Sequence, residues 1–208
     1  MSGAKAIGLI SGIIAIIDVA VKIYTAVSDA SGIPEAFRDA STRLPLVRET
    51  LQTALQNFET SDPDDSLYQA IKPVLDGCKQ KASRLEEVFR KVIPSASASR
   101  MEQYLRAVRT VGKGSLVESL MQGILRDVQL LATNSVMNLA TDEQLEELAR
   151  AEDEVSAIPP SLPPQTLSGI SNSGPGIQNV NTGGGTQNNN NGSGQQFVGG
   201  TFNGPMNF

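Results

Sequence analysis

The sequence predicts an all-α fold, a helical bundle of about five to six helices followed by a disordered, amyloid-prone C-terminal tail. Apolar residues recur at three- and four-residue spacing between residues 4 and 155, which is the period of a helix with one buried face. The tail, residues 156–208, contains no Asp, Glu, Lys or Arg, and its Gly, Asn, Gln, Ser and Pro cannot build a core. We expect a helical domain at 1–155, a Pro/Ser/Gly-rich linker at 156–175 and a Gly/Asn/Gln-rich motif at 176–208.

The first expected helix, residues 4–30, is very rich in aliphatic residues, which cover most of its circumference. Such a helix lies either at the centre of a bundle or in a membrane. Its uncharged run at 6–17 is shorter than the roughly 20 residues that a membrane span needs. Asp18 and Lys22 follow at a spacing that favours an ion pair. We therefore expect a core helix in the resting state.

Three small residues, Ala4, Gly8 and Gly12, stand four apart in this helix. In lipid such a ridge lets two helix backbones approach closely. In water the two glycines only cost about 1 kcal/mol each relative to alanine. The ridge leaves open that a helix buried at rest becomes a membrane helix in another state.

Further helices are expected at 34–58 and 62–93, with Pro45 and Pro73 as sources of a kink. Three capping boxes, at 99–102, 115–118 and 141–144, mark the starts of later helices. In a capping box two side chains satisfy backbone amides that have no partner within the helix. The last helix is expected to end near Val155.

The side chains that carry most chemistry are scarce. The chain has no His and one Cys, and Cys78 falls on an apolar helix face, which favours a buried thiol over a nucleophile and fits a reduced, intracellular compartment. Residues 112–115 read Gly-Lys-Gly-Ser but lack the earlier Gly of a phosphate-binding loop, which favours a helix–helix turn. A net charge of −5 argues against a nucleic-acid partner. We expect no enzyme, no cofactor and no metal site.

A small basic cluster, Arg100, Arg106, Arg109 and Lys113, is opposed by Glu102. It is either a solvated helix face or a contact for anionic lipid head groups, and both interpretations stay open.

The tail carries an imperfect repeat. Gly-x-Gln-x-Val occurs at 176–180 and 194–198, and Gly-Gly-Thr-x-Asn occurs at 184–188 and 199–203. Uncharged tracts rich in Asn and Gln are prone to cross-β stacking, so the two copies predict two rungs that stack on each other or on another chain. The alternative is a chance match in a low-complexity segment. The candidate residues of the amyloid motif are Gly176, Gln178, Val180, Thr186, Asn188, Gly194, Gln196, Val198, Thr201, Phe202 and Asn203.

Residues 10–51, ISGIIAIIDVAVKIYTAVSDASGIPEAFRDASTRLPLVRETL, resemble the SesA-type domain of filamentous fungi, the N-terminal domain found on NACHT NTPases and other P-loop NTPases. Such domains are similar in architecture to the HeLo and HELL cell-death domains. The tail resembles the fungal amyloid signalling motifs, of the sigma or the pseudo-palindromic type.

The resemblance implies an effector of fungal programmed cell death or heterokaryon incompatibility. A NOD-like receptor (NACHT or NB-ARC) with a matching motif would template the tail, and the protein would move from the cytoplasm to the plasma membrane. The alternative is a non-lytic adaptor or inhibitor in the same pathway. The membrane-active residues that the resemblance implies lie in the first helix: Ile7, Gly8, Ile10, Gly12, Ile13, Ile14 and Ile17.

Overall fold

A computed structural model of the chain describes residues 2–26, 32–61, 65–93, 99–112, 116–133 and 139–162. These residues form six α-helices and contain no strand, which confirms the all-α class. The helices are α1 (Ser2–Thr25), α2 (Glu35–Ser61), α3 (Asp65–Val92), α4 (Arg100–Val111), α5 (Val117–Ala132) and α6 (Asp142–Ser156).

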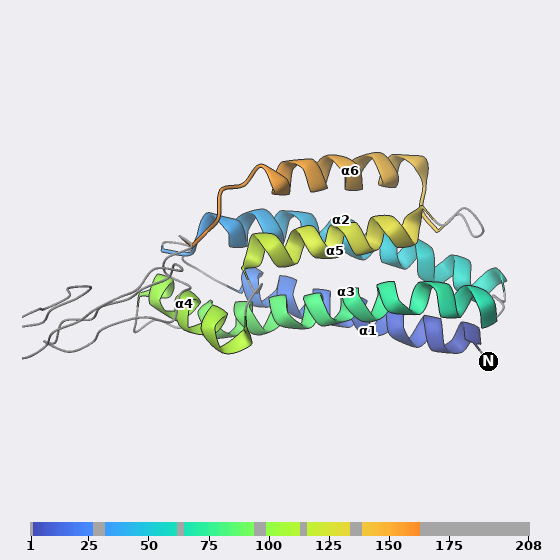
Figure 1. Cartoon of the computed structure of the whole chain (residues 1–208), viewed down its shortest axis with the longest axis horizontal. Helices are drawn as coiled ribbons and strands as arrows, with labels where there is room; N and C mark the ends of the chain where they lie inside the picture. Colours follow the sequence, from blue (N-terminus) through green and yellow to red (C-terminus); the bar gives the residue numbers. More distant parts are fainter. Residues whose placement is uncertain are drawn as a thin grey trace, which may run out of the picture. The chain divides into compact units, whose positions relative to one another are not determined.

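Four of the helices form a closed bundle. α1 packs against α2 and α3, and α5 packs against the same two helices. α1 and α3 run in one direction, while α2 and α5 run in the other (Figure 1). α4 packs against α3 at one end of the bundle, and α6 lies outside it over α5 and α2 (Figure 1).

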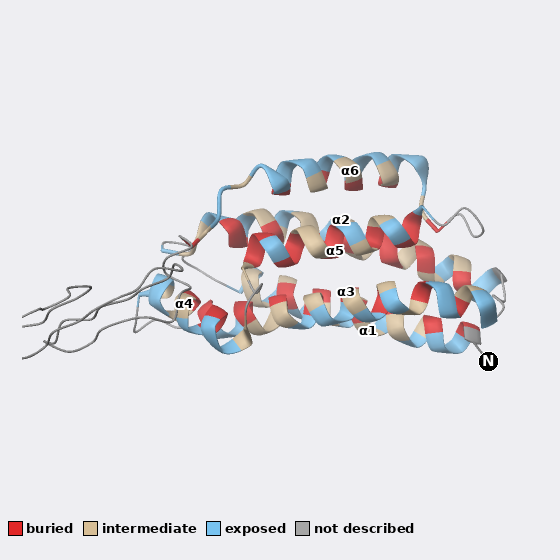
Figure 2. Cartoon of the chain, viewed as in Figure 1, coloured by how far each residue is buried: buried red, intermediate tan, exposed pale blue. Residues whose placement is uncertain are grey.

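The core follows the three-four spacing of helix bundles. In α2 it contains Leu44, Val47 and Leu51, each 0 % exposed, and continues to Ala54 and Phe58. Figure 2 shows buried positions on the inward faces of the helices and exposed positions on their outward faces. Burying one large aliphatic side chain contributes about 1.5–3 kcal/mol, so these inward faces hold the domain together.

The capping box at the start of α6 is confirmed. The Thr141 hydroxyl accepts a hydrogen bond from the Gln144 backbone amide at 3.2 Å, and the Gln144 side chain accepts one from the Thr141 amide at 3.1 Å. The last helix ends at Ser156, next to the expected Val155.

The other two capping boxes are wrong. Ser99 occupies the N-cap of α4, but its side chain makes no capping hydrogen bond. α5 begins one residue later than expected, at Val117, with the apolar Leu116 at its N-cap. Glu118 is not a capping residue because its carboxylate binds the segment that follows α6, as described below.

Neither proline ends its helix. α2 continues through Pro45 and α3 through Pro73. Both prolines are exposed, so water can reach the carbonyl that each leaves without an intrahelical partner. The first helix ends earlier than expected, at Thr25, and residues 27–31 lie outside the described part of the chain.

The folded domain continues beyond its expected boundary at residue 155. The segment after α6 runs back to the bundle, where Leu162 is 2 % exposed and belongs to the hydrophobic core. The expected linker therefore begins with residues that pack on the helices.

Candidate functional site

The predicted membrane-active helix, α1, buries a narrow seam. The seam comprises Ala6, Ile10, Ile13, Ile17 and Ala20, each at most 1 % exposed. The other two predicted isoleucines, Ile7 and Ile14, are half-buried at its side. α1 thus packs within the bundle, as the expected core helix does, but as one of its four walls and not at its centre.

The glycine ridge does not contact another helix closely. Ala4 and Gly8 are exposed, and a Cβ added at Gly8 would meet no atom within 4 Å. Gly12 is half-buried, with the end of the Lys79 side chain 4.0 Å from its added Cβ. The structure therefore separates the predicted residues: the isoleucines face the core or its edges, and Gly8 faces solvent.

The outer face of α1 is mostly uncharged. Lys5 and Lys22 are its exposed charges. Asp18, at the edge of this face, accepts a hydrogen bond from Arg48 of α2 at 2.6 Å and not from Lys22 as the spacing predicted. The Asp18 and Arg48 side chains are 36 % and 42 % exposed, so their ion pair contributes at most about 1 kcal/mol. α1 is held to the bundle mainly by its apolar seam.

Among the described residues, α1 is the one helix that is long and apolar enough to cross a membrane, over Gly3–Thr25. That stretch includes Asp18 and Lys22, while the uncharged run at 6–17 alone remains shorter than the roughly 20 residues of a span. Core helices of soluble proteins can also meet this criterion, but most of their surface is buried. In α1 only 28 % of the most apolar stretch is buried.

Aromatic rings connect the C-terminal end of α1 to α4. Tyr24 of α1 lies 6.2 Å from Phe89 of α3, measured between ring centroids. Phe89 stacks on Phe37 of α2 at 5.0 Å, and Phe37 meets Tyr104 of α4 edge-on at 5.1 Å. Each such pair contributes about 0.5–1.5 kcal/mol beyond its buried area. Four helices therefore meet in one continuous aromatic cluster.

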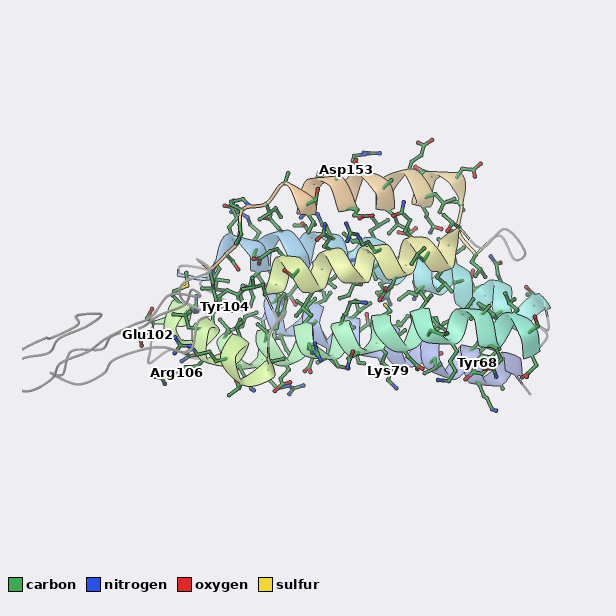
Figure 3. The ribbon with its side chains drawn as sticks, viewed as in Figure 1. Tyr68, Lys79, Glu102, Tyr104, Arg106 and Asp153 are labelled. Carbon is green, nitrogen blue, oxygen red and sulfur yellow. The ribbon has the colours of Figure 1, made fainter. Side chains whose placement is uncertain are left out.

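Figure 3 labels Tyr104 on α4. Its hydroxyl ends this cluster in a hydrogen-bond network. It accepts from the backbone amide of Val117 at 3.0 Å, one of the amides at the start of α5 that have no partner within the helix. It also lies 2.7 Å from the Ser161 hydroxyl. Burial raises the pKa of Tyr104 to about 12, although its bonds to Ser161 and Val117 act in the other direction.

Glu118 binds the segment after α6. The Ser161 amide donates to one carboxylate oxygen at 2.9 Å, and the Ser161 hydroxyl donates to the other at 2.7 Å. The Ser161 hydroxyl has one hydrogen, which it donates to Glu118. It therefore accepts its hydrogen bond from the Tyr104 hydroxyl. Glu118 is 8 % exposed, and hydrogen bonds to a charged group contribute about 1.5–3 kcal/mol each.

Residues 10–131, more than half of the chain, match the SesA family, described as an N-terminal domain on NACHT NTPases and P-loop NTPases. The chain belongs to the SesA family. No curated protein and no solved structure matches it. The SesA match covers α1 from Ile10 onward, α2, α3, α4 and most of α5.

Residues 167–208 match the sigma domain found on NACHT NTPases. This match confirms the sigma type of the two that the sequence left open, and it contains every predicted residue of the amyloid motif, from Gly176 to Asn203. Those residues lie outside the described part of the structure. The sigma motif implies pairing with a NACHT NTPase that carries a matching motif, and its combination with SesA suggests an effector in a NACHT-NTPase signalling pathway.

Other predicted positions of the SesA domain have structural roles. Cys78 is buried, and burial together with Asp127 raises the pKa of its thiol to about 12. Gly112 ends α4 with a φ of 109°, as a helix–helix turn would, while residues 113–115 lie outside the described part. Arg106 and Arg109 are exposed on α4, and this cluster still fits either interpretation.

Sequence reasoning missed the network of Tyr104, Glu118 and Ser161. In the sequence, Glu118 belongs to an expected capping box and Ser161 lies in the expected linker. One signal was available, because Glu118 lies among Val117, Leu120 and Met121 and was bound to need a buried partner. No pattern in the sequence indicated that the partner stands 43 residues later.

Proposed function

We propose that this protein is an effector of fungal programmed cell death or heterokaryon incompatibility, activated through its tail by a NACHT NTPase of the NOD-like receptor type. The observation that carries the proposal is the presence of a SesA domain and a sigma motif in one chain. The function is signalling by assembly, without catalysis. The chain is cytoplasmic at rest and acts at the plasma membrane when activated.

The tail is the receiving part of the signal. Its lack of charge removes the repulsion that would oppose stacking of identical chains, and its amide side chains can form ladders in a cross-β structure. A receptor with a matching motif supplies the template. Further copies of this chain then add to it by self-association through residues 176–208.

The membrane step is assigned to α1. Between Lys5 and Lys22 the exposed positions of its outer face are small or apolar and carry no charge, so lipid would accept this part of the face as well as the aliphatic seam that now faces the core. Removing α1 from the bundle exposes Ile10, Ile13 and Ile17, each at a cost of about 1.5–3 kcal/mol in water. Inserting these side chains into lipid offsets most of that cost, because lipid also removes them from water. The bundle therefore retains α1 until a trigger and a membrane are both present.

Seeded dye release tests the proposal. Full-length protein is mixed with fibrils of a peptide covering residues 156–208 and with anionic phospholipid vesicles that hold a self-quenched dye. Thioflavin fluorescence reports conversion of the tail, and dye release reports damage to the membrane. We expect both signals with seeds and neither without them.

Two proline variants of the full-length chain, Gln196→Pro and Phe202→Pro, are the controls, because proline cannot donate to a β ladder. Both are expected to convert at least tenfold more slowly and to release little dye. Conversion without dye release would refute the membrane step and favour the non-lytic adaptor or inhibitor. Equal conversion of wild type and both variants would refute the two-rung register.

A further inference from the structure

The segment after α6, residues 157–162, joins the helical domain to the tail and is itself bound to the domain. Pro159 and Pro160 are exposed, whereas Ser161 bonds Glu118 and Tyr104 and Leu162 is buried. We propose that residues 157–162 are a strap that stabilises the resting bundle, and that release of this strap carries conversion of the tail to α1. The role of α1 after release rests on the proposed function.

The strap is built as a specific attachment. Both oxygens of the buried Glu118 carboxylate accept hydrogen bonds from Ser161, and the Tyr104 hydroxyl completes the set. The two prolines restrict the backbone before Ser161, so less conformational entropy is lost when the strap docks. A mere linker needs neither a buried carboxylate nor a core leucine.

The spacing of chains in a fibril explains how conversion of the tail would favour release of the strap. Cross-β strands stack about 4.8 Å apart, so a chain with two rungs occupies about 10 Å of a fibril. A bundle two helices wide measures about 20 Å, because one helix with its side chains is about 10–12 Å across. Neighbouring helical domains therefore crowd each other at the fibril surface.

The connection has a limited length. The sigma match begins at residue 167 and the first predicted rung at Gly176, so the chain from Leu162 to that rung extends at most about 50 Å. Freeing residues 157–162 adds about 20 Å to the reach of each domain and relieves the crowding. Growth of the fibril thus favours the state in which the strap is released.

Contacts lead from the strap to α1. Ser161 touches Tyr104, and the rings of Tyr104, Phe37, Phe89 and Tyr24 follow in sequence to the last turn of α1. Loss of the strap removes one of the two hydrogen-bond partners of Tyr104, the Ser161 hydroxyl, and opens one end of this cluster. Contiguity alone does not establish coupling, so the test must measure α1 when only the strap is changed.

Native-state hydrogen exchange of the free full-length protein is that measurement. The variant Ser161→Ala removes the hydroxyl that bonds both Glu118 and Tyr104. We expect amide exchange about tenfold faster in the strap and in the last two turns of α1, from Asp18 to Thr25. The control Ser156→Ala removes an exposed hydroxyl that bonds only the Asp153 carbonyl of its own helix, and it should leave α1 unchanged.

A second variant, Glu118→Gln, keeps the shape of the side chain and removes its charge. It should accelerate amide exchange in the strap and in the last two turns of α1. If Ser161→Ala does not fold, the Glu118→Gln variant tests the proposal in its place. Faster exchange in the strap with unchanged exchange in α1, in either variant that folds, would overturn the coupling. Equal effects of Ser156→Ala and Ser161→Ala would overturn the role of the strap.

The seeded vesicles then separate this inference from the proposed function. With α1 coupled to the strap, Ser161→Ala should release dye at a several-fold lower seed concentration than wild type. If hydrogen exchange shows the coupling but no form of the protein releases dye, the membrane function is refuted and the role of the strap is supported. Dye release from wild type without any effect of Ser161→Ala on α1 refutes the strap alone.

Discussion

At the scale of single residues, Tyr104 links three parts of the SesA domain. Its ring packs edge-on against Phe37, and its hydroxyl satisfies the first amide of α5 while it bonds Ser161. The side chain is 0 % exposed, so water cannot replace any of these partners. The Tyr104 hydroxyl therefore has to stay protonated for the network to hold.

Tyr104 should make the domain sensitive to high pH. Its pKa is raised from 10.0 to about 12, so its contribution to stability is complete below pH 10 and is lost as the pH rises through 12. At pH 11 ionisation of this residue stabilises the unfolded state, relative to the folded state, by about 1.4 kcal/mol. Urea unfolding gives the free energy of unfolding at pH 8 and at pH 11. The fall between the two pH values should be about 1 kcal/mol smaller in Tyr104→Phe than in the protein with Tyr104.

The buried Cys78 titrates over an overlapping range, since its pKa is raised from 9.0 to about 12. The comparison is therefore made in a Cys78→Ala background, which removes the thiol from both proteins. If the free energy of unfolding depends on pH in the same way with Tyr and with Phe at position 104, burial does not raise the pKa of the Tyr104 hydroxyl.

Residue-scale roles were the hardest to predict. The sequence indicated correctly that Cys78 is buried, because the period of its helix placed it on the apolar face. The partners of Asp18 and Glu118 could not be predicted, since Arg48 and Ser161 come from other elements. Local spacing describes neighbours within a helix and contains no information on which helix packs alongside.

At the scale of elements, α1 combines two surfaces that a bundle rarely needs together. One is a seam of aliphatic residues and the other is an exposed ridge with a glycine in mid-helix. The six helices were predictable because their apolar period and polar interruptions are local. Their ends were less so, and Leu116 at the N-cap of α5 shows that tertiary contacts can replace a capping side chain.

The ridge glycine should lower the stability of the resting domain. Gly8→Ala is expected to raise the free energy of unfolding by about 0.5–1 kcal/mol, because alanine restricts the unfolded chain and meets no atom within 4 Å here. Gly112→Ala is the matched control. Its φ of 109° strains any residue with a side chain, so stability should fall by about 1–3 kcal/mol.

Urea denaturation of both variants provides the comparison. A loss of stability in Gly8→Ala would mean that another part of the molecule covers the ridge. Such a result would contradict the exposed outer face of α1 on which the membrane proposal depends.

At the scale of the whole molecule, the chain unites a SesA domain with a sigma motif, the segment that converts in the proposed function. The SesA domain holds α1 by apolar burial, and in the proposed function lipid replaces the core around it. Composition alone separated the two parts, because a tail without charge stands out against the helical domain. Composition could not show that the junction is docked, since Pro-rich sequences look alike whether they are free or bound.

The central claim is that conversion of the tail moves α1 from the bundle into a membrane. The most direct measurement places a polarity-sensitive fluorophore on Gly8→Cys in a Cys78→Ala background, at a position where the added side chain is exposed at rest. Emission should shift to shorter wavelength only when tail fibrils and anionic vesicles are both present. An unchanged emission after the tail has converted in the presence of vesicles, or the same shift with vesicles alone, would contradict the account.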